Sequence, residues 1–295
     1  MLDIQWPQQL QTSLEAKLGE ATAAQRLYGL SQNEVWLIKF ANIDLILKSS
    51  TSGREARFYA QVGPILRKND VAIPICYEQF AENGIQWLAL EYVPRPFPKE
   101  RWLADGEALL LLYRLHQTTL NNPPKDRFQP AWSDDLTLQA AQILAGSADD
   151  VQLLRRVAIE CQLLFAGTSW LSGDPNPKNW GIGDGRLANN RLANNRLILF
   201  DWERFCQGDP AIDLAITVPG FGQKSDFEQV AHTYLAFGTT PTTANVTELT
   251  HKMILAKAWT IVEFLAAIYR EQVGKTAVGI DHFQARFLPW LRQNF

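Results

Sequence analysis

The stretch SGDPNPKNW at residues 172–180, followed by FDWE at residues 200–203, sets out a polar loop, an intervening segment and a second polar loop. Asp174 and Asn179 stand five residues apart in the first loop, and Asp201 follows an apolar run. If the segment between the loops folds into paired strands, Asn179 returns beside Asp201 and two oxygen side chains face a Mg²⁺ ion. Asp174 can then accept a proton from a substrate hydroxyl. The alternative is that Asp and Asn occur here because proline-rich turns favour them.

The composition of the whole chain narrows the class of protein to which it can belong. The chain has 295 residues, of which 46% are hydrophobic and 20% charged, as in ordinary globular proteins, and its length favours two lobes. Its 28 Lys and Arg against 31 Asp and Glu leave a net charge of -3, which argues against nucleic acid and anionic membranes as partners. No apolar run approaches the roughly 18 to 20 residues of a membrane span, and the first residues do not read as a signal peptide. A cytoplasmic location is the expectation.

Cysteine and histidine spacing indicates which metals to expect. The three cysteines, Cys76, Cys161 and Cys206, are far apart and odd in number, which argues against a disulfide framework or a zinc site. The four histidines show no close spacing of metal ligands, and His116 is expected to be a packed histidine near a helix end. Any metal should therefore be held by oxygen atoms.

The first third of the chain is rich in strands. The predicted elements are helices over 7–19 and 53–66, and two hairpins, one of 35–40 with 43–48 and one of 72–80 with 85–92. Gly63-Pro64 must distort or end the second helix. The proline-rich segment 94–98 then separates this region from the rest. The predicted domains are an N-terminal lobe over residues 1–93 and a C-terminal lobe over residues 94–295.

The remainder of the chain is rich in helices. They are predicted at about 100–120, 134–146, 149–166, 224–237, 243–272 and 281–293. Short strands and turns interrupt them over residues 169–217, where loops can bring polar groups together. Inside this interruption the letters RLANN occur twice in succession, at 186–190 and 191–195. The duplication is predicted to lengthen the loop of a hairpin, with a flap facing a substrate as the alternative.

These motifs resemble the aminoglycoside phosphotransferase and choline kinase-like superfamily, whose catalytic loop reads H-G-D-x-x-x-x-N and whose metal loop reads D-x-[DEG]. The resemblance implies an α+β, two-lobed protein kinase-like fold with a small antiparallel sheet in the N-lobe and a larger, mainly helical C-lobe. It implies a kinase that transfers the γ-phosphoryl group of ATP or GTP to a hydroxyl of a small molecule. Asp174 would be the catalytic base, and Asn179 and Asp201 would hold Mg²⁺. Ser172 stands where the family has histidine.

The resemblance extends over roughly residues 29 to 217. Residues 29–35, GLSQNEV, resemble the turn that covers the nucleotide, and GREARFY at 53–59 resembles the helix whose glutamate pairs with the phosphate-binding lysine. The nucleotide-binding residues that the resemblance implies are Ser31, Asn33, Lys48, Glu55 and, at the hinge, the backbone of Glu91 and Val93. GDPAIDLA at 208–215 is similar to the segment that braces the catalytic loop. There Asp209 is expected to cap a helix and Asp213 to reach loop amides.

Of the expected features, the identity of the phosphoryl acceptor is the one that the sequence determines least. Members of the family act on aminoglycosides, choline, ethanolamine, sugars and fructosamines. Glu203 is a candidate for metal or substrate, with a solvated or structural carboxylate as the alternative. Trp259 and Glu263 lie four residues apart, share a helix face and could meet a ligand amine, although their helical spacing favours core packing.

Two other classes of function stay open. One is a catalytically inactive, pseudokinase-like module that binds nucleotide, for which Ser172 and the duplicated loop are the support. The other is a hydrolase that uses Asp174 and Asp201 with a metal. The first predicts binding without turnover, and the second predicts phosphate release without an acceptor.

Overall fold

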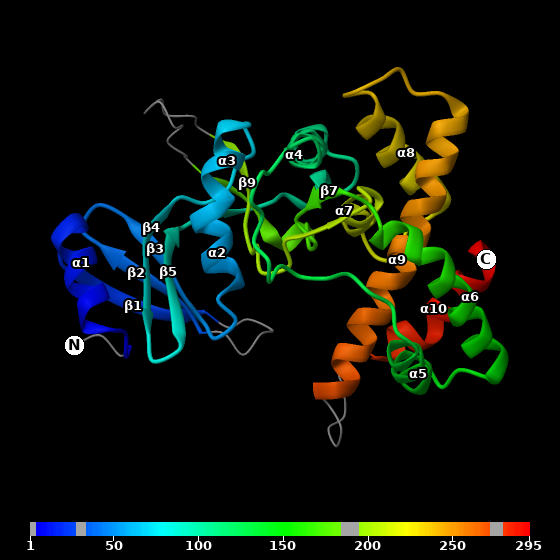
Figure 1. Ribbon diagram of the computed structural model, residues 1–295, viewed down its shortest axis with the longest axis horizontal. Helices are drawn as coiled ribbons and strands as arrows, with labels where there is room; N and C mark the ends of the chain where they lie inside the picture. The colour runs from blue at the N-terminus through cyan, green and yellow to red at the C-terminus, as the bar shows by residue number, and fades with distance from the viewer. Residues whose placement is uncertain (1–3, 28–33, 184–194, 272–279) are drawn as a thin grey trace. The chain divides into compact units, whose positions relative to one another are not determined.

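A computed structural model describes residues 4–27, 34–183, 195–271 and 280–295. The chain forms two compact units, each built from separate stretches of sequence (Figure 1). Unit 1 comprises Met1–Phe97, Leu120–Arg127 and Lys178–Arg204, and unit 2 comprises Pro98–Thr119, Phe128–Pro177 and Phe205–Phe295. The predicted α+β, kinase-like architecture is confirmed. The division into lobes 1–93 and 94–295 stays a prediction.

Unit 1 is built on a five-stranded antiparallel sheet of order β1-β2-β3-β5-β4. The strands are β1 (Ala21–Leu27), β2 (Val35–Phe40), β3 (Asp44–Ser50), β4 (Cys76–Glu82) and β5 (Ile85–Glu91), and the helices are α1 (Gln8–Leu18), α2 (Arg54–Gln61) and α3 (Gly63–Lys68). A smaller sheet has the order β6-β8-β9, with β6 (Arg95–Pro96), β8 (Trp180–Gly183) and β9 (Arg196–Leu199). Both predicted hairpins of the first third are present.

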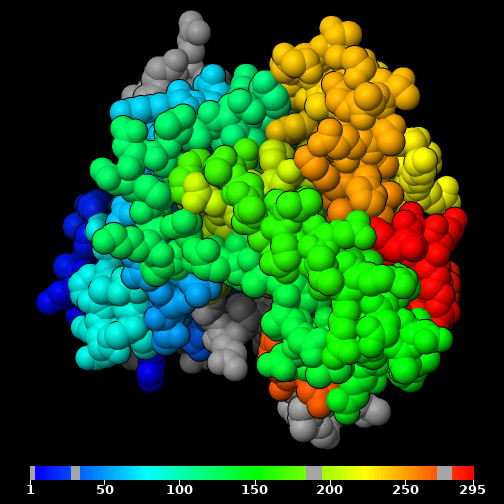
Figure 2. All heavy atoms as spheres, turned by 45° about the vertical axis from the view of Figure 1, so that its right-hand side comes forward, coloured from blue at the N-terminus to red at the C-terminus, as the bar shows by residue number. Residues whose placement is uncertain are grey.

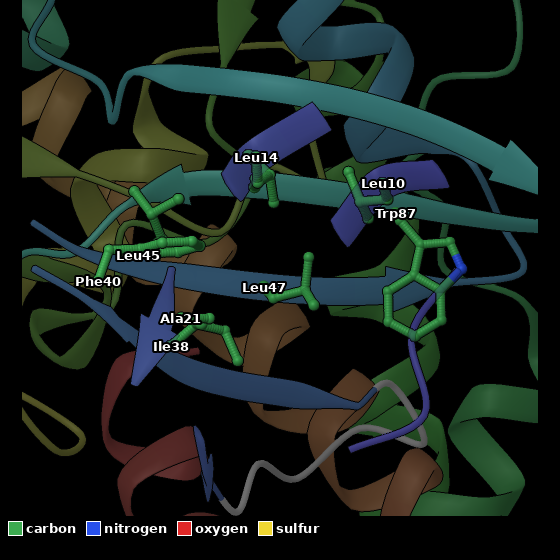
Figure 3. Packing of buried hydrophobic residues seen from close by; sticks show 9 residues of the cluster. Leu10, Leu14, Ala21, Ile38, Phe40, Leu45, Leu47 and Trp87 are labelled. Carbon is green, nitrogen blue, oxygen red and sulfur yellow. The ribbon is translucent and has the colours of Figure 1, made fainter. Parts of the chain in front are cut away.

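The two faces of the large sheet have different roles. Leu45 and Leu47 of β3 point to the face that α1 covers, where they pack in one cluster with Leu10 and Leu14 (Figure 3). Because side chains alternate along a strand, Lys48 lies on the opposite face. The alternation in the sequence of β3 therefore separates an apolar core from a charged position.

Three details of unit 1 differ from the sequence prediction. Strand β1 was not predicted as a defined element, since ATAAQRL has few β-branched or aromatic residues. Strand β4 begins at Cys76 rather than at residue 72, because Pro74 has no N–H to donate to a ladder. The helix predicted over 53–66 is divided at Val62 into α2 and α3, with Pro64 in the first turn of α3.

Unit 2 consists mainly of helices around α9 (Thr243–Glu271), which packs against α5, α6, α7 and α8. The other helices are α4 (Gly106–His116), α5 (Asp134–Ile143), α6 (Ala148–Phe165), α7 (Ala211–Thr217), α8 (Lys224–Leu235) and α10 (Ile280–Asn294), with a 3-10 turn at Lys99–Arg101. A second 3-10 turn, Pro177–Asn179, begins at the last residue of a unit 2 stretch and continues into unit 1. β7 (Ser169–Leu171) pairs with β10 (Cys206–Gly208). α10 adjoins α6 at the surface (red beside green in Figure 2), where Arg292 donates to Asp150 Oδ1 over 2.6 Å.

The predicted helices of this region are all present, with ends that differ by a few residues. The longest difference is at α4, which begins at Gly106 rather than near residue 100, because Asp105 accepts hydrogen bonds from the N–H groups of Glu107 and Ala108 and so caps the helix. Within the residues that the structure describes, no helix is long and apolar enough to span a membrane.

Lys257 of α9 is a buried lysine in the core of unit 2. Its side chain is 6% exposed, and its ammonium donates to the carbonyl of Val218, just past the end of α7, over 2.6 Å. Burial lowers the pKa of Lys257 from 10.5 to about 7. Below pH 7 the folded and the unfolded chain both carry this proton, and the folded chain bears the full cost of burying the charge.

This lowered pKa predicts a pH-dependent stability. Between pH 7 and 10.5 only the unfolded chain retains the Lys257 proton, so the cost falls as the pH rises, by at most about 1.4 kcal/mol per pH unit. The free energy of unfolding should be measured in urea for the wild type and Lys257→Met at pH 7, 8 and 9. As the pH rises, the wild type should gain stability relative to the variant. Lys252→Met is the matched control, because ion pairing raises the pKa of Lys252 and its difference should stay flat over this range. A flat difference for Lys257→Met as well would refute the assignment.

Candidate functional site

Lys48 lies at the centre of an ion-pair network in unit 1. Its Nζ is 2.6 Å from Glu55 Oε2 on α2 and 2.8 Å from Asp201 Oδ1, just after β9. Lys48 and Glu55 are 9% and 3% exposed, whereas the Asp201 side chain is 45% exposed. The ion pair that the sequence analysis expected between Lys48 and Glu55 is present, and one carboxylate at the edge of the network remains open to solvent.

The charges in this network depend on one another. Burial alone would lower the pKa of Lys48, but the carboxylates of Glu55 and Asp201 outweigh it and raise that pKa above its ordinary value. Burial raises the pKa of Glu55, and the ammonium of Lys48 opposes that rise. Lys48 is therefore a permanently charged group, fixed in place and directed toward Asp201.

The loop that carries Asp201 is fastened to α2. The N–H of Trp202 donates to Glu55 Oε1 over 3.2 Å, and the Trp202 ring stacks on Phe58 with 4.4 Å between centroids. Ser52, before α2, donates to Glu203 Oε1 over 3.1 Å. Asp201 itself has a φ of 66°, a left-handed conformation that is strained for a residue with a side chain. These contacts fix that conformation, and Glu203 is bonded to Ser52.

Contacts of Arg57 also hold α2 in place. Arg57 Nε donates to Asp126 Oδ1 over 2.9 Å, and Arg57 Nη2 donates to the second carboxylate oxygen and, over 2.8 Å, to the carbonyl of Ser52. Gly53 has a φ of 64°, and a Cβ there would lie 2.8 Å from the Arg57 guanidinium. Glycine at 53 thus allows the close approach by which Arg57 ties α2 to residues 120–127.

Paired strands bring Asn179 beside the Asp201 loop. β8 and β9 pair with Trp180 opposite Leu199, and the N–H of Phe200 donates to the carbonyl of Asn179 over 2.9 Å. The predicted hairpin is present; the RLANN duplication, apart from Asn195, lies outside the described residues. An amide and a carboxylate from adjoining backbone, one of them half exposed, fit Mg²⁺, which takes one or two protein oxygens plus water and phosphate. Among the described residues, no three His, Cys, Asp or Glu side chains gather as a metal cluster.

Glu91 and Val93, which were predicted to form a hinge, lie at the end of β5 and just after it. The N–H of Glu91 donates to the carbonyl of Ile75 over 2.8 Å, and the N–H of Ile75 donates to Glu91 Oε2 over 3.0 Å. Burial raises the pKa of the Glu91 carboxyl. Val93 packs against Gly181 so closely that a Cβ on Gly181 would lie 2.6 Å from Val93 Cγ1. Ser31 and Asn33 lie outside the described residues, and the nucleotide-binding roles of all these residues stay predictions.

In unit 2, a buried carboxylate holds the loop that precedes Asp174. Asp213 of α7 is 0% exposed and accepts from the N–H of Ser172 over 2.8 Å and from that of Gly173 over 2.9 Å. This confirms that Asp213 reaches loop amides. Asp209 Oδ1 accepts from the N–H of Ala211, although Pro210, and not Asp209, occupies the capping position of α7.

Sequence reasoning assigned no site role to His116, yet His116 contacts Asp213, the residue that holds this loop. Its Nε2 is 3.2 Å from Asp213 Oδ2, and its Nδ1 is 2.8 Å from the hydroxyl of Tyr234. No local pattern could have indicated these contacts, because 97 residues separate His116 from Asp213 and 118 separate it from Tyr234.

The candidate acceptor residues of α9 differ in their surroundings. Trp259 is 0% exposed, its indole N–H donates to the carbonyl of Ala131 over 2.9 Å, and its ring meets Phe165 edge to face. The structure therefore gives Trp259 the core packing that its spacing also allowed. Glu263, one turn further along α9, is half-buried.

The family model described as the phosphotransferase enzyme family matches residues 24–249. The chain belongs to this family. No curated protein sequence matches the chain significantly.

Solved structures share the fold at low sequence identity. The ethanolamine kinase of Plasmodium vivax is 14% identical, with a TM-score of 0.61, over 92% of this chain and 84% of that one. A spectinomycin phosphotransferase in complex with ADP and spectinomycin is 12% identical, with a TM-score of 0.63, over 99% and 94%. A choline/ethanolamine kinase family protein of Mesorhizobium loti is 15% identical, with a TM-score of 0.59, over 96% and 94%.

The buried ion pair predicts a strong energetic coupling between Lys48 and Glu55. In a double-mutant cycle of Lys48→Met and Glu55→Gln, each single change should cost about 3 kcal/mol of unfolding free energy. Lys48→Met leaves the buried Glu55 carboxylate without its cation, and Glu55→Gln leaves Lys48 with only the half-exposed Asp201. The double variant should lose clearly less than the sum, with a coupling of about 2 kcal/mol. The exposed pair Lys17–Glu78 is the control, and Lys17→Met with Glu78→Gln should couple by less than about 1 kcal/mol. Equal couplings in the two cycles would contradict a special role for the buried pair.

Proposed function

We propose that the protein is a small-molecule kinase that transfers the γ-phosphoryl group of ATP or GTP to a hydroxyl of a small, amine-bearing acceptor. The observation that carries this proposal is the buried Lys48, held by Glu55 and directed at the half-exposed carboxylate of Asp201. A nucleoside triphosphate and its metal ion need such an arrangement for binding: a fixed cation beside a solvent-facing carboxylate and a neighbouring amide.

The residues of unit 1 have binding roles in this proposal. Lys48 acts as a point charge on the nucleotide phosphates, and Glu55 keeps it in position. Asp201 and Asn179 hold Mg²⁺, which, when bound, neutralises negative charge on the phosphates. The left-handed backbone at Asp201 is retained by the bond from the Trp202 N–H to Glu55. Ser31, Asn33 and the hinge backbone of Glu91 and Val93 contact the nucleotide.

Asp174 has the chemical role. Its carboxylate accepts the proton of the acceptor hydroxyl as the oxygen of that hydroxyl bonds to the γ-phosphorus. The bond from the γ-phosphorus to the bridging oxygen breaks at the same time, and the nucleoside diphosphate leaves with that oxygen. The Ser172 and Gly173 amides bonded to Asp213 keep the backbone before Asp174 in place for this step.

The fold neighbours support an amine-bearing acceptor. One is an ethanolamine kinase, and another binds spectinomycin together with ADP. Carboxylates are the side chains that pair with amines, and Glu203 and the half-buried Glu263 are the candidates.

Nucleotide binding is tested first. The thermal unfolding midpoint of the wild type should rise with ATP or GTP in the presence of Mg²⁺, since ligand at 100 times Kd adds about 2.7 kcal/mol of stability. Asp201→Ala should abolish the Mg²⁺-dependent part of the shift. Asp44→Ala, at the start of β3, is the matched control and should keep it. A folded wild type that shifts with neither nucleotide would overturn the proposal.

Turnover is tested on amino alcohols, aminoglycosides and sugars. Asp174→Ala should lower kcat by about 10²- to 10⁴-fold, because the base is lost, while the nucleotide-induced shift stays at the wild-type value. Nucleotide binding without turnover on any hydroxyl would indicate the inactive binding module instead. Phosphate release that no acceptor accelerates would indicate a hydrolase.

A further inference from the structure

An exposed serine, Ser52, has a hydrogen bond within the protein at each of its polar groups. Its N–H donates to Ser50 Oγ over 3.2 Å, and its carbonyl accepts from Arg57 Nη2 over 2.8 Å. Its hydroxyl oxygen lies 3.1 Å from Ser50 Oγ, 3.1 Å from Glu203 Oε1 and 3.4 Å from the backbone nitrogen of Arg54. At the surface water satisfies such groups, so this set of protein partners indicates a side chain with a fixed position.

The chemistry of the groups sets the direction of each hydroxyl bond. An ionised carboxylate only accepts, so the single Ser52 hydroxyl proton is donated to Glu203. The two lone pairs of the same oxygen then accept, one from the N–H of Arg54 and one from the Ser50 hydroxyl. The donor and both acceptor positions of the hydroxyl are filled, and its rotation is therefore fixed.

Ser52 links the start of α2 to the loop that carries Asp201. Gly53 occupies the capping position of α2 and has no side chain, so the Ser52 hydroxyl accepts the N–H of Arg54 in place of a cap. The bond to Glu203 spans 151 residues of sequence and ends just beyond Asp201. The N-terminal end of a helix also favours a carboxylate beside it.

Three consecutive residues of this loop contact the segment from β3 to α2. The contacts are those of Asp201 with Lys48, of the Trp202 N–H with Glu55, and of Glu203 with Ser52. The left-handed backbone of Asp201, with a φ of 66°, is strained and persists where its surroundings hold it. The bond from Ser52 is the last of the three along the loop, and it holds the chain that leaves Asp201.

We propose that Ser52 is a positioning residue: by holding Glu203 it fixes the loop from which Asp201 binds the metal ion of the nucleotide. The inference rests on the proposed function for its consequence in nucleotide binding. It assigns Ser52 no contact with the ion, the nucleotide or the acceptor. Loss of the Ser52 hydroxyl should therefore raise the Mg²⁺ concentration that nucleotide binding needs, and leave kcat at saturating Mg²⁺ and nucleotide near the wild-type value.

The first test measures the nucleotide-induced thermal shift as a function of the Mg²⁺ concentration. Ser52→Ala should raise the midpoint of this titration at least about fivefold, since loss of a group that orients a metal ligand costs about 10- to 100-fold in metal affinity. Ser52→Thr keeps the hydroxyl and should stay within about twofold of the wild type. Thr51→Ala removes a hydroxyl from the exposed neighbouring residue and is the matched control, with an unchanged midpoint. A wild-type midpoint in Ser52→Ala would overturn the proposal.

A double variant shows whether Ser52 acts through Glu203. Glu203→Ala removes the acceptor of the Ser52 hydroxyl and should raise the Mg²⁺ midpoint by a similar factor. Adding Ser52→Ala to Glu203→Ala should change the midpoint by less than about twofold, because the bond is already lost. If the two effects multiply instead, Ser52 does not act through Glu203 and the inference fails.

Amide hydrogen exchange separates this inference from the proposed function. The Trp202 N–H is bonded to Glu55, so its exchange in the protein without nucleotide or metal reports how firmly the loop is held. Exchange should accelerate at least about fivefold in Ser52→Ala and stay slow in Ser52→Thr and Thr51→Ala. If the wild type binds no nucleotide, the proposed function fails while exchange still decides whether Ser52 holds the loop. Unchanged exchange in Ser52→Ala would refute the inference.

Discussion

The buried ion pair between Lys48 and Glu55 is the constraint on which unit 1 depends. A charge with 9% of its surface exposed is stabilised by an opposite charge beside it, and here that contact joins β3 to α2. Glu55 also accepts a hydrogen bond from the N–H of Trp202, and this bond holds the loop after β9. One carboxylate therefore joins a strand, a helix and a loop, and it leaves Asp201 half exposed at their junction.

Unit 2 uses a buried carboxylate in a comparable way. Asp213 accepts two backbone N–H groups immediately before Asp174, as Glu55 accepts the one immediately after Asp201. In each unit the bond is made to the backbone of the loop, at Ser172 and Gly173 in one unit and at Trp202 in the other. The second carboxylate differs in its partner, because a histidine–tyrosine pair accompanies Asp213 where a lysine accompanies Glu55.

The sequence predicted what spacing along the chain encodes. Paired strands were expected to bring Asn179 toward the Asp201 loop, and Asp213 was expected to reach loop amides, and both contacts are present. The sequence could not predict contacts that arise only from tertiary packing. His116 read as an ordinary packed histidine because its partners lie about a hundred residues away, and Trp259 fitted both a ligand site and a core until its burial was known.

The anchoring of the loop before Asp174 bears on the role of Ser172. Asp213 is bonded to the N–H groups at 172 and 173, which any residue but proline provides, so the bracing does not require a particular side chain at 172. A buried serine hydroxyl without a partner costs about 1–3 kcal/mol, a stability cost that leaves the loop geometry intact. Serine in place of histidine is therefore no reason in itself to expect an inactive module. The proposed function requires the side chains of Lys48, Asp174 and Asp201, and all three are present.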